Sequence, residues 1–297
     1  MQNLTDVQAL LNVDINHIQA PTRRLALKTA VGVGYCAAAW PVVAQTAIKT
    51  PSDGLIQGEV TIDVNGFKMP AFRSAPAGKT NLPLILVLSE VFGVHEYIAD
   101  VTRRFALQGY IAIAPELFVR QGDPQSYGEI AMMFAEVIEK VPDVQVMNDL
   151  DACVAWAKSQ GARVDQLGVT GFCWGGRQTL LYAAHNPSVK AAVAWYGRIH
   201  GKATPQSPTH PIDMVGKMQA PILGLYGSAD TGIPVDHVNQ LKNALMQSTT
   251  RAKQSQFVIY PDAPHAFHAD YRPTYRQQPA QDGWLKALAW FKQHGVG

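Results

Sequence analysis

The chain has 297 residues and a formal net charge of +2 at pH 7, and 47% of its residues are hydrophobic and 16% charged. This composition is ordinary for a globular enzyme, and neither a low-complexity segment nor a repeat of roughly 20–50 residues interrupts it. The weak net charge, with no basic run beyond the N-terminal region, argues against a nucleic-acid partner.

Residues 1–44 have the pattern of an export signal. Arg23 and Arg24 precede a weakly apolar stretch at 29–43, and Val42-Val43-Ala44 offers the small residues that signal peptidase accepts. We therefore expect recognition by the twin-arginine export machinery, cleavage after Ala44 and a periplasmic mature protein. The alternative is a disordered tail followed by a short membrane-associated helix. No other segment approaches the roughly 18 apolar residues of a membrane span, so we expect no stable span in the mature protein.

Residues 45–297 alternate between strand and helix patterns and suit one α/β domain. Strands at 60–64 and 69–73 suit a hairpin around Asn65-Gly66. The alternation that follows implies a mostly parallel sheet with helices on both faces. The further predicted strands lie at 84–88, 111–114, 167–170, 191–195, 222–226 and 256–260, and the predicted helices lie at 96–108, within 127–160, and at 177–186, 235–246 and 284–294.

The segment Gly171-Phe172-Cys173-Trp174-Gly175-Gly176 connects the strand at 167–170 to the helix at 177–186. It has the pattern of a nucleophile elbow, Gly-x-nucleophile-x-Gly, with cysteine in place of the usual serine. Such a turn strains the backbone of its nucleophile and needs glycines, because side chains beside it would clash. The helix N-terminus favours a thiolate, so we expect Cys173 to be a nucleophile. The alternative is a buried cysteine in a glycine-rich turn.

An acid and a histidine follow Cys173 in the order that an elbow enzyme requires. Asp230 lies in a turn after the strand at 222–226, and His265 lies in a loop after the strand at 256–260. All three residues fall just past the carboxyl ends of predicted strands, where open parallel sheets place their ligand sites. Taken singly, Asp230 could cap a turn and His265 could be a surface residue.

Glu90 follows the continuous apolar run at 84–88, which is typical of a fully buried strand. Its carboxylate is therefore expected near the elbow. We expect the backbone N–H groups of Val91 and Trp174 to form the two halves of an oxyanion hole. Taken singly, Glu90 could be a solvated acid at a strand end.

Together these motifs are specific to one family: Glu90-Val91-Phe92-Gly93, Ala114-Pro115-Glu116-Leu117, the hexapeptide 171–176, Asp230 and Pro264-His265-Ala266-Phe267. The chain resembles the dienelactone hydrolases, or carboxymethylenebutenolidases, which have the α/β-hydrolase fold. The resemblance runs from about Gly58 to the C-terminus, and it implies a hydrolase of carboxylic esters or lactones. It implies Cys173 as nucleophile, His265 as base and Asp230 as the residue that orients the imidazole, with a thioester acyl-enzyme intermediate. It also implies that Glu90 interacts with the resting thiol and swings away when substrate binds.

The chain departs from the family's best-known members, which hold the substrate carboxylate with two arginines. The segment 125–140 contains no arginine, and Ala269 stands four residues past His265, where the second arginine is expected. We therefore expect neutral esters or lactones to be accepted at least as well as anionic dienelactones. The candidate substrate-binding residues are Arg120, Tyr196, Arg198, Phe267, His268 and Arg272, with Arg177 as a further cation nearby.

We expect no cofactor and no metal. His265, His268 and Asp270 look like a metal trio, but His-x-x-His lacks the i, i+4 spacing of helical zinc sites. Cys36 lies in the export signal and Cys153 on the buried face of a predicted helix, which leaves Cys173 as the candidate reactive thiol. The expected partners are a small ester or lactone substrate and the export machinery, and we expect a monomer.

Two other functions remain open from the sequence. A thiol-dependent redox protein would also use Cys173, but the chain has no Cys-x-x-Cys, and Cys153 lies in a different element from the nucleophile. A catalytically inactive periplasmic binding protein could retain the fold, although the intact set of catalytic residues argues against it. Ester turnover that depends on Cys173 separates the first function from these two.

Overall fold

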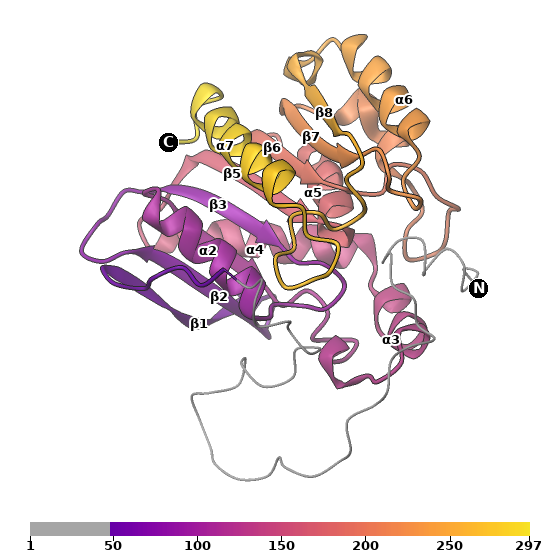
Figure 1. The fold of residues 1–297 in the computed structure, drawn as a ribbon. Helices are drawn as coiled ribbons and strands as arrows, with labels where there is room; N and C mark the ends of the chain where they lie inside the picture. The colour runs from indigo at the N-terminus through magenta and orange to yellow at the C-terminus, as the bar shows by residue number, and fades with distance from the viewer. Residues whose placement is uncertain (1–47) are drawn as a thin grey trace.

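Figure 1 shows a twisted sheet with helices on both faces, in a computed structural model that describes residues 48–297. Within these residues the strand order is β1-β2-β4-β3-β5-β6-β7-β8. The β1–β2 and β2–β4 pairs are antiparallel, and the remaining neighbours are parallel, so the predicted mostly parallel α/β sheet is confirmed. The strands are β1 (Leu55–Val64), β2 (Phe67–Pro76), β3 (Pro83–Leu88), β4 (Ile111–Pro115), β5 (Arg163–Phe172), β6 (Val189–Trp195), β7 (Ile222–Gly227) and β8 (Gln256–Tyr260).

Helices α2 and α7 pack on one face of the sheet, and α4 and α5 pack on the other (Figure 1). α3 projects beside the carboxyl ends of the central strands, where it can form one wall of a site. The α-helices are α2 (Glu96–Leu107), α3 (Ile130–Glu136), α4 (Asp143–Ser159), α5 (Trp174–His185), α6 (Val235–Met246) and α7 (Gln277–Gln293). Short 3₁₀ helices are η2 (Pro124–Ser126), η3 (Ile138–Lys140), η4 (Pro211–Lys217) and η5 (Arg251–Gln254).

Two helices begin earlier than the sequence pattern predicts, and the first of them is α5, which starts at Trp174 rather than at 177. α7 starts at Gln277 rather than at 284, and it contains Pro279 in its first turn. A proline is tolerated there because the first N–H groups of a helix have no acceptor within the helix. Gly283 belongs to the same helix, and a Cβ at this position would lie 2.7 Å from the Trp195 ring. Pro279 and Gly283 are therefore both compatible with α7, although proline and glycine usually interrupt a helix.

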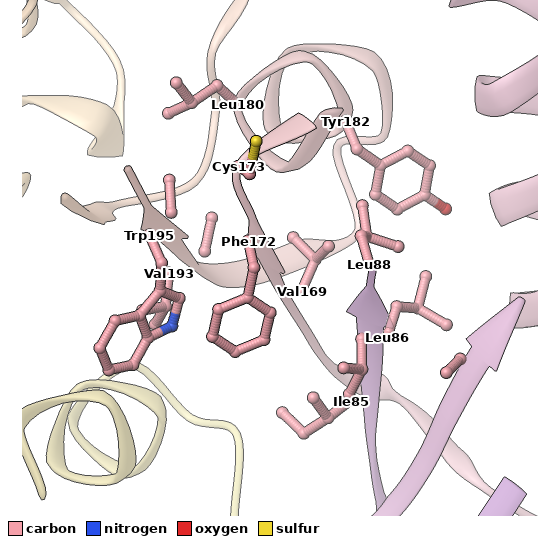
Figure 2. Packing of buried hydrophobic residues seen from close by; sticks show 14 of the residues in the cluster. Ile85, Leu86, Leu88, Val169, Phe172, Cys173, Leu180, Tyr182, Val193 and Trp195 are labelled. Atoms are coloured by element: carbon pink, nitrogen blue, oxygen red, sulfur yellow. The ribbon is translucent and has the colours of Figure 1, made fainter. Parts of the chain in front are cut away.

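The centre of the sheet is apolar on both faces, and this packing holds the nucleophile strand in place. Figure 2 shows Ile85, Leu86 and Leu88 of β3 beside Val169 and Phe172 of β5. Each of these side chains is fully buried, and burying one aliphatic or aromatic side chain contributes about 1.5–3 kcal/mol. Cys173 stands at the end of this apolar strand, where β5 turns into α5 (Figure 2).

The predicted signal and its cleavage site after Ala44 lie outside the described residues. Within residues 48–297, no helix is both long enough and apolar enough to cross a membrane.

Candidate active site

Cys173 occupies a strained turn between β5 and α5. Its backbone has φ 55° and ψ −113°, a left-handed conformation that residues other than glycine rarely adopt. The Cys173 N–H donates to the Trp195 carbonyl at 3.1 Å, which ties the turn to the end of β6. The adjacent glycines are required by space, because a Cβ at Gly171 would lie 2.6 Å from Thr179 Oγ1 and one at Gly175 would lie 2.5 Å from the Ser89 carbonyl.

Asp230 and His265 form a buried pair at the neighbouring strand ends. His265 Nδ1 lies 2.7 Å from Asp230 Oδ2, and both side chains are almost completely buried. The other carboxylate oxygen of Asp230 accepts hydrogen bonds from the N–H groups of Gly232 (2.9 Å) and Ile233 (3.1 Å). These bonds fix the carboxylate, and the carboxylate in turn fixes the orientation of the imidazole.

The free nitrogen of His265 is available for proton transfer. Nε2 is buried and has no hydrogen-bond partner within the described residues. Burial alone would lower the pKa of His265, but the negative charges of Asp230 and then Cys173 outweigh burial and raise that pKa to about 10. The protonated imidazole is therefore favoured at this position, beside the sulfur of Cys173.

Glu90 is fully buried in the loop that follows β3. Its Oε2 accepts a hydrogen bond from the Tyr271 hydroxyl at 2.7 Å, and its Oε1 lies 3.5 Å from Arg272 Nη1. No hydrogen bond joins Glu90 to Cys173 in the part of the chain that the structure describes. The carboxylate thus accepts a hydrogen bond from a phenol and forms an ion pair with a guanidinium, and it has no hydrogen bond to the thiol among the described residues.

The two backbone donors expected for an oxyanion hole border the same space. Val91 is buried in the loop after β3, and Trp174 is the first residue of α5, so the Trp174 N–H has no acceptor within its own helix. The Gly175 N–H donates to the Ser89 carbonyl at 3.1 Å and holds the elbow against the loop that carries Val91. This contact sets the separation between the two donors.

A cavity of about 340 Å³ opens above Cys173. Its lining is apolar on the side of α3 and η3 and polar on the side of the loop that follows β6. Tyr196, with φ 38° and a buried hydroxyl that has no hydrogen-bond partner in the described residues, lies between Cys173 and that loop. The apolar lining comprises Val91, Phe134, Ile138, Val141 and Trp174, and the polar lining comprises Glu139, Arg177, Arg198, Lys202, Thr204, Gln206, Ser207 and His210.

The four candidate arginines differ in their partners and in their position relative to the cavity. Arg120 forms two hydrogen bonds to Asp149, at 2.7 and 2.8 Å, and does not line the cavity. Arg177 lines it, but both of its terminal nitrogens bond to Asp143, at 2.6 and 2.8 Å. Arg198 also lines the cavity. Arg272 is buried beside Glu90.

Phe267 and His268 lie behind the nucleophile strand rather than in the cavity. Phe267 packs in the core against the rings of Tyr196 and Tyr260. His268 Nδ1 is 2.6 Å from the Tyr97 hydroxyl, and burial, followed by the charge of Arg104, lowers the pKa of His268 well below its usual value. His268 lines a separate cavity of about 440 Å³ beside α7.

The residues that resemble a metal trio do not converge on one point. His265 pairs with Asp230, His268 with Tyr97, and Asp270 with Arg104. Within residues 48–297, no group of three or more histidine, cysteine or acidic side chains could hold a metal ion.

Sequence reasoning missed Tyr271 and most of the cavity lining. Tyr271 is separated from Glu90 by 181 positions, and no motif includes it. Phe134 and Ile138 come from the short helices α3 and η3, and Lys202, Thr204, Gln206 and Ser207 come from a loop without regular secondary structure. The sequence patterns had singled out five lining residues, namely Val91, Trp174, Arg177, Tyr196 and Arg198, and Trp174 also packs on Phe118.

A cysteine elbow, a buried histidine–aspartate pair and a cavity at the carboxyl edge of a mostly parallel sheet are the features of the α/β-hydrolase class. Residues 69–295 match the sequence profile of the Dienelactone hydrolase family. The chain therefore belongs to the dienelactone hydrolase family, and it is a hydrolase.

Similar proteins agree with this family and this fold. The chain is 51% identical to "Putative carboxymethylenebutenolidase" of Methylorubrum extorquens, over 96% of this chain and 98% of that protein. It is 48% identical to the Escherichia coli K12 protein of the same name, over 88% of this chain and 96% of that one. The crystal structure titled "Putative Dienelactone Hydrolase" from Klebsiella pneumoniae superposes with a TM-score of 0.78 at 49% identity, over 81% of this chain and 100% of that chain. The predicted family and α/β-hydrolase fold are thus confirmed.

Proposed function

We propose that the protein hydrolyses carboxylic esters or lactones through a Cys173–His265–Asp230 triad. The observation that carries the proposal is the alignment of three groups at one edge of the sheet: a strained cysteine at a helix N-terminus, an imidazole with a free Nε2, and a carboxylate fixed by two N–H groups. The relatives' names, which refer to a lactone hydrolase, point to the same reaction.

In the acylation step, the sulfur of Cys173 attacks the carbonyl carbon and forms a C–S bond. The carbonyl oxygen takes the negative charge and is stabilised by the N–H groups of Val91 and Trp174. The C–O bond of the ester then breaks, and the Nε2–H of protonated His265 gives its proton to the leaving alkoxide. The products of this step are the alcohol and a thioester on Cys173.

In the deacylation step, neutral His265 removes a proton from water, and the resulting hydroxide attacks the thioester carbonyl. The C–S bond breaks, the carboxylic acid leaves, and the thiolate–imidazolium pair is restored. Asp230 keeps the proton of Nδ1 in place throughout, so Nε2 remains the nitrogen that exchanges protons. A lactone follows the same steps, with the alcohol remaining part of the released hydroxy acid.

The cavity supports a substrate whose acyl part is apolar. Phe134 and Ile138 line it within the arginine-free segment 125–140, where the family's best-known members carry a carboxylate-binding arginine. Of the cations that line the cavity, Arg177 is already bonded to the carboxylate of Asp143, whereas Arg198 and Lys202 belong to the polar lining and lie outside the segment 125–140. We therefore propose neutral esters or lactones as the preferred substrate class, and we propose export to the periplasm on the pattern of residues 1–44.

Cys173→Ala tests the reaction. The substitution removes only the sulfur, so we expect ester hydrolysis to be abolished while the free energy of unfolding changes little. Cys153→Ala is the matched control, because Cys153 is buried in α4 away from the cavity and should leave the turnover number unchanged. Retention of most of the kcat in Cys173→Ala would show that another group attacks the substrate.

A further inference from the structure

Glu90 is the one acidic side chain within the described residues that is completely buried at the elbow yet takes no part in the proposed triad. A buried carboxylate is stable only when charge and hydrogen bonds compensate for its lost hydration. Its partners here are Tyr271, at 2.7 Å, and Arg272, whose guanidinium is 3.5 Å away. Both belong to the same loop as His265.

Tyr271 is held in place by aromatic packing at the start of α2. Its ring lies 4.8 Å from the ring of His95 and 5.3 Å from that of Tyr97. Burial, followed by the charge of Glu90, raises the pKa of Tyr271 well above its usual value. The phenol therefore keeps its proton and donates it in a hydrogen bond to Glu90.

Arg272 supplies the charge that Glu90 requires. It is buried, and the centre of its guanidinium lies 5.9 Å above the Phe92 ring. Burial opposes its charge, but Tyr271, Glu90 and Cys173 together raise the pKa of Arg272, so the guanidinium stays protonated. A carboxylate bonded to a phenol and offset by a guanidinium has little need of the thiol as a partner.

We propose that Tyr271 and Arg272 are positioning residues that hold Glu90 away from Cys173, so that the resting enzyme is ready to attack substrates that carry no carboxylate. This inference rests on the proposed ester or lactone hydrolysis. In the arrangement that the family resemblance implies, Glu90 interacts with the resting thiol until substrate arrives. Here Glu90 has other partners, so no group of the substrate is needed to displace the carboxylate from the thiol.

Several charged or titratable groups lie around Cys173 and Glu90, and the test must separate the effect of Glu90 from the effects of the others. The loops after β7 and β8 contribute Asp230 and His265, and the loop after β3 contributes Glu90. Further groups are Tyr196 after β6, His95 and Tyr97 at the start of α2, and Tyr271 and Arg272. Charged and titratable side chains that line the cavity with Cys173 are Glu139, Arg177, Arg198, Lys202 and His210.

The test is the rate at which iodoacetamide alkylates Cys173 in the full-length protein between pH 5 and pH 9. Peptide mass spectrometry distinguishes Cys173 from Cys36 and Cys153. In the wild type, we expect the rate at pH 6 to remain close to that at pH 8. Tyr271→Phe keeps the ring but removes the hydrogen bond, so Glu90 is free to interact with the thiol. We expect its rate at pH 6 to fall by roughly tenfold, the effect of displacing the thiolate titration by one unit.

Tyr260→Phe is the matched control, because Tyr260 also donates to a carboxylate, that of Asp282, at 2.7 Å but away from the site. Its alkylation profile should equal that of the wild type. Glu90→Gln combined with Tyr271→Phe should restore the wild-type profile, since no carboxylate remains to compete for the thiol. Arg272→Gln provides a second variant if Tyr271→Phe does not fold, and it should also lower the alkylation rate of Cys173 at pH 6.

An unchanged profile in both Tyr271→Phe and Arg272→Gln would overturn the proposal. A wild type that is alkylated only above pH 8 would also overturn it, because the resting thiol would then be protonated. If the double variant is still alkylated slowly at pH 6, the proposal is also wrong, because the Tyr271 phenol would then affect Cys173 by some means other than through Glu90. Alkylation needs no turnover, so a protein that behaves as expected here but hydrolyses no ester would refute the proposed function alone.

Discussion

Replacing Gly175 with alanine tests whether the close packing of the elbow creates the site. Gly175 follows Trp174 in the first turn of α5, and its N–H donates to the Ser89 carbonyl at 3.1 Å. A Cβ at this position would lie 2.5 Å from that carbonyl oxygen and closer still to the Leu88 carbonyl. Both atoms belong to the backbone, so no side-chain rotation can relieve the clash.

The expected changes in the free energy of unfolding and in kcat follow from the displacement that the clash requires. The contact is about 0.9 Å short of the 3.4 Å at which ordinary van der Waals contact begins. Relieving it must move the elbow away from the loop after β3, and Val91 and Trp174 lie on opposite sides of that junction. We expect overpacking to lower the free energy of unfolding by about 1–3 kcal/mol. We expect kcat to fall by about a hundredfold or more, as when one oxyanion donor is lost.

Denaturant unfolding and steady-state hydrolysis of a neutral aryl ester measure the two effects. Gly216→Ala is the control, because Gly216 lies in η4, has no left-handed backbone, and has no atom within 4 Å of a built Cβ. Its stability and kcat should remain close to those of the wild type. If Gly175→Ala kept the wild-type unfolding midpoint and kcat, the junction between the elbow and β3 would not position the donors.

Three further predictions follow from the cavity, the buried histidines and the N-terminal pattern. Neutral esters or lactones should show kcat/KM values at least equal to those of anionic dienelactones. A clear preference for the anionic substrate would contradict the proposal that the cavity wall at Phe134 contacts an uncharged acyl group. Burial, followed by the charge of Arg272, lowers the pKa of His95 to about 4. Between about pH 6.5 and pH 4 the unfolded chain therefore binds a proton that the folded protein does not, so the free energy of unfolding should decrease by about 3 kcal/mol over this range. His95→Gln should flatten this dependence in denaturant titrations, and an equally steep decrease in the variant would assign it to other groups. Replacing Arg23 and Arg24 with lysine should trap full-length precursor in the cytoplasm, whereas mature protein in the periplasmic fraction would exclude the twin-arginine route.

The common location of the three residues of the proposed triad could be predicted because each of them follows a short apolar run. Cys173, Asp230 and His265 directly follow β5, β7 and β8, and parallel strands bring their carboxyl ends to one edge. The order of the motifs along the chain and the alternation of strand and helix patterns were therefore enough to place these residues together. The same reasoning placed Glu90 at the end of β3.

The partners of these residues could not be predicted, because they depend on contacts between distant elements. Arg120 was a candidate for substrate binding, but α4 brings Asp149 to it, and the two bond at 2.7 and 2.8 Å. Glu90 meets Tyr271 only after β3 and the loop beyond β8 have been assembled. Local patterns carry no information about such pairings, which follow from the packing of the whole domain.

The central claim is that Cys173 carries the acyl group during turnover. The most direct measurement is intact-protein mass spectrometry after rapid acid quench during hydrolysis of a neutral aryl ester, with peptide mapping of the modified residue. Our account predicts a mass increase equal to the acyl group, confined to the peptide that contains Cys173 and absent from Cys173→Ala. Steady turnover by an unmodified wild-type protein, or an acyl group on a different residue, would contradict it.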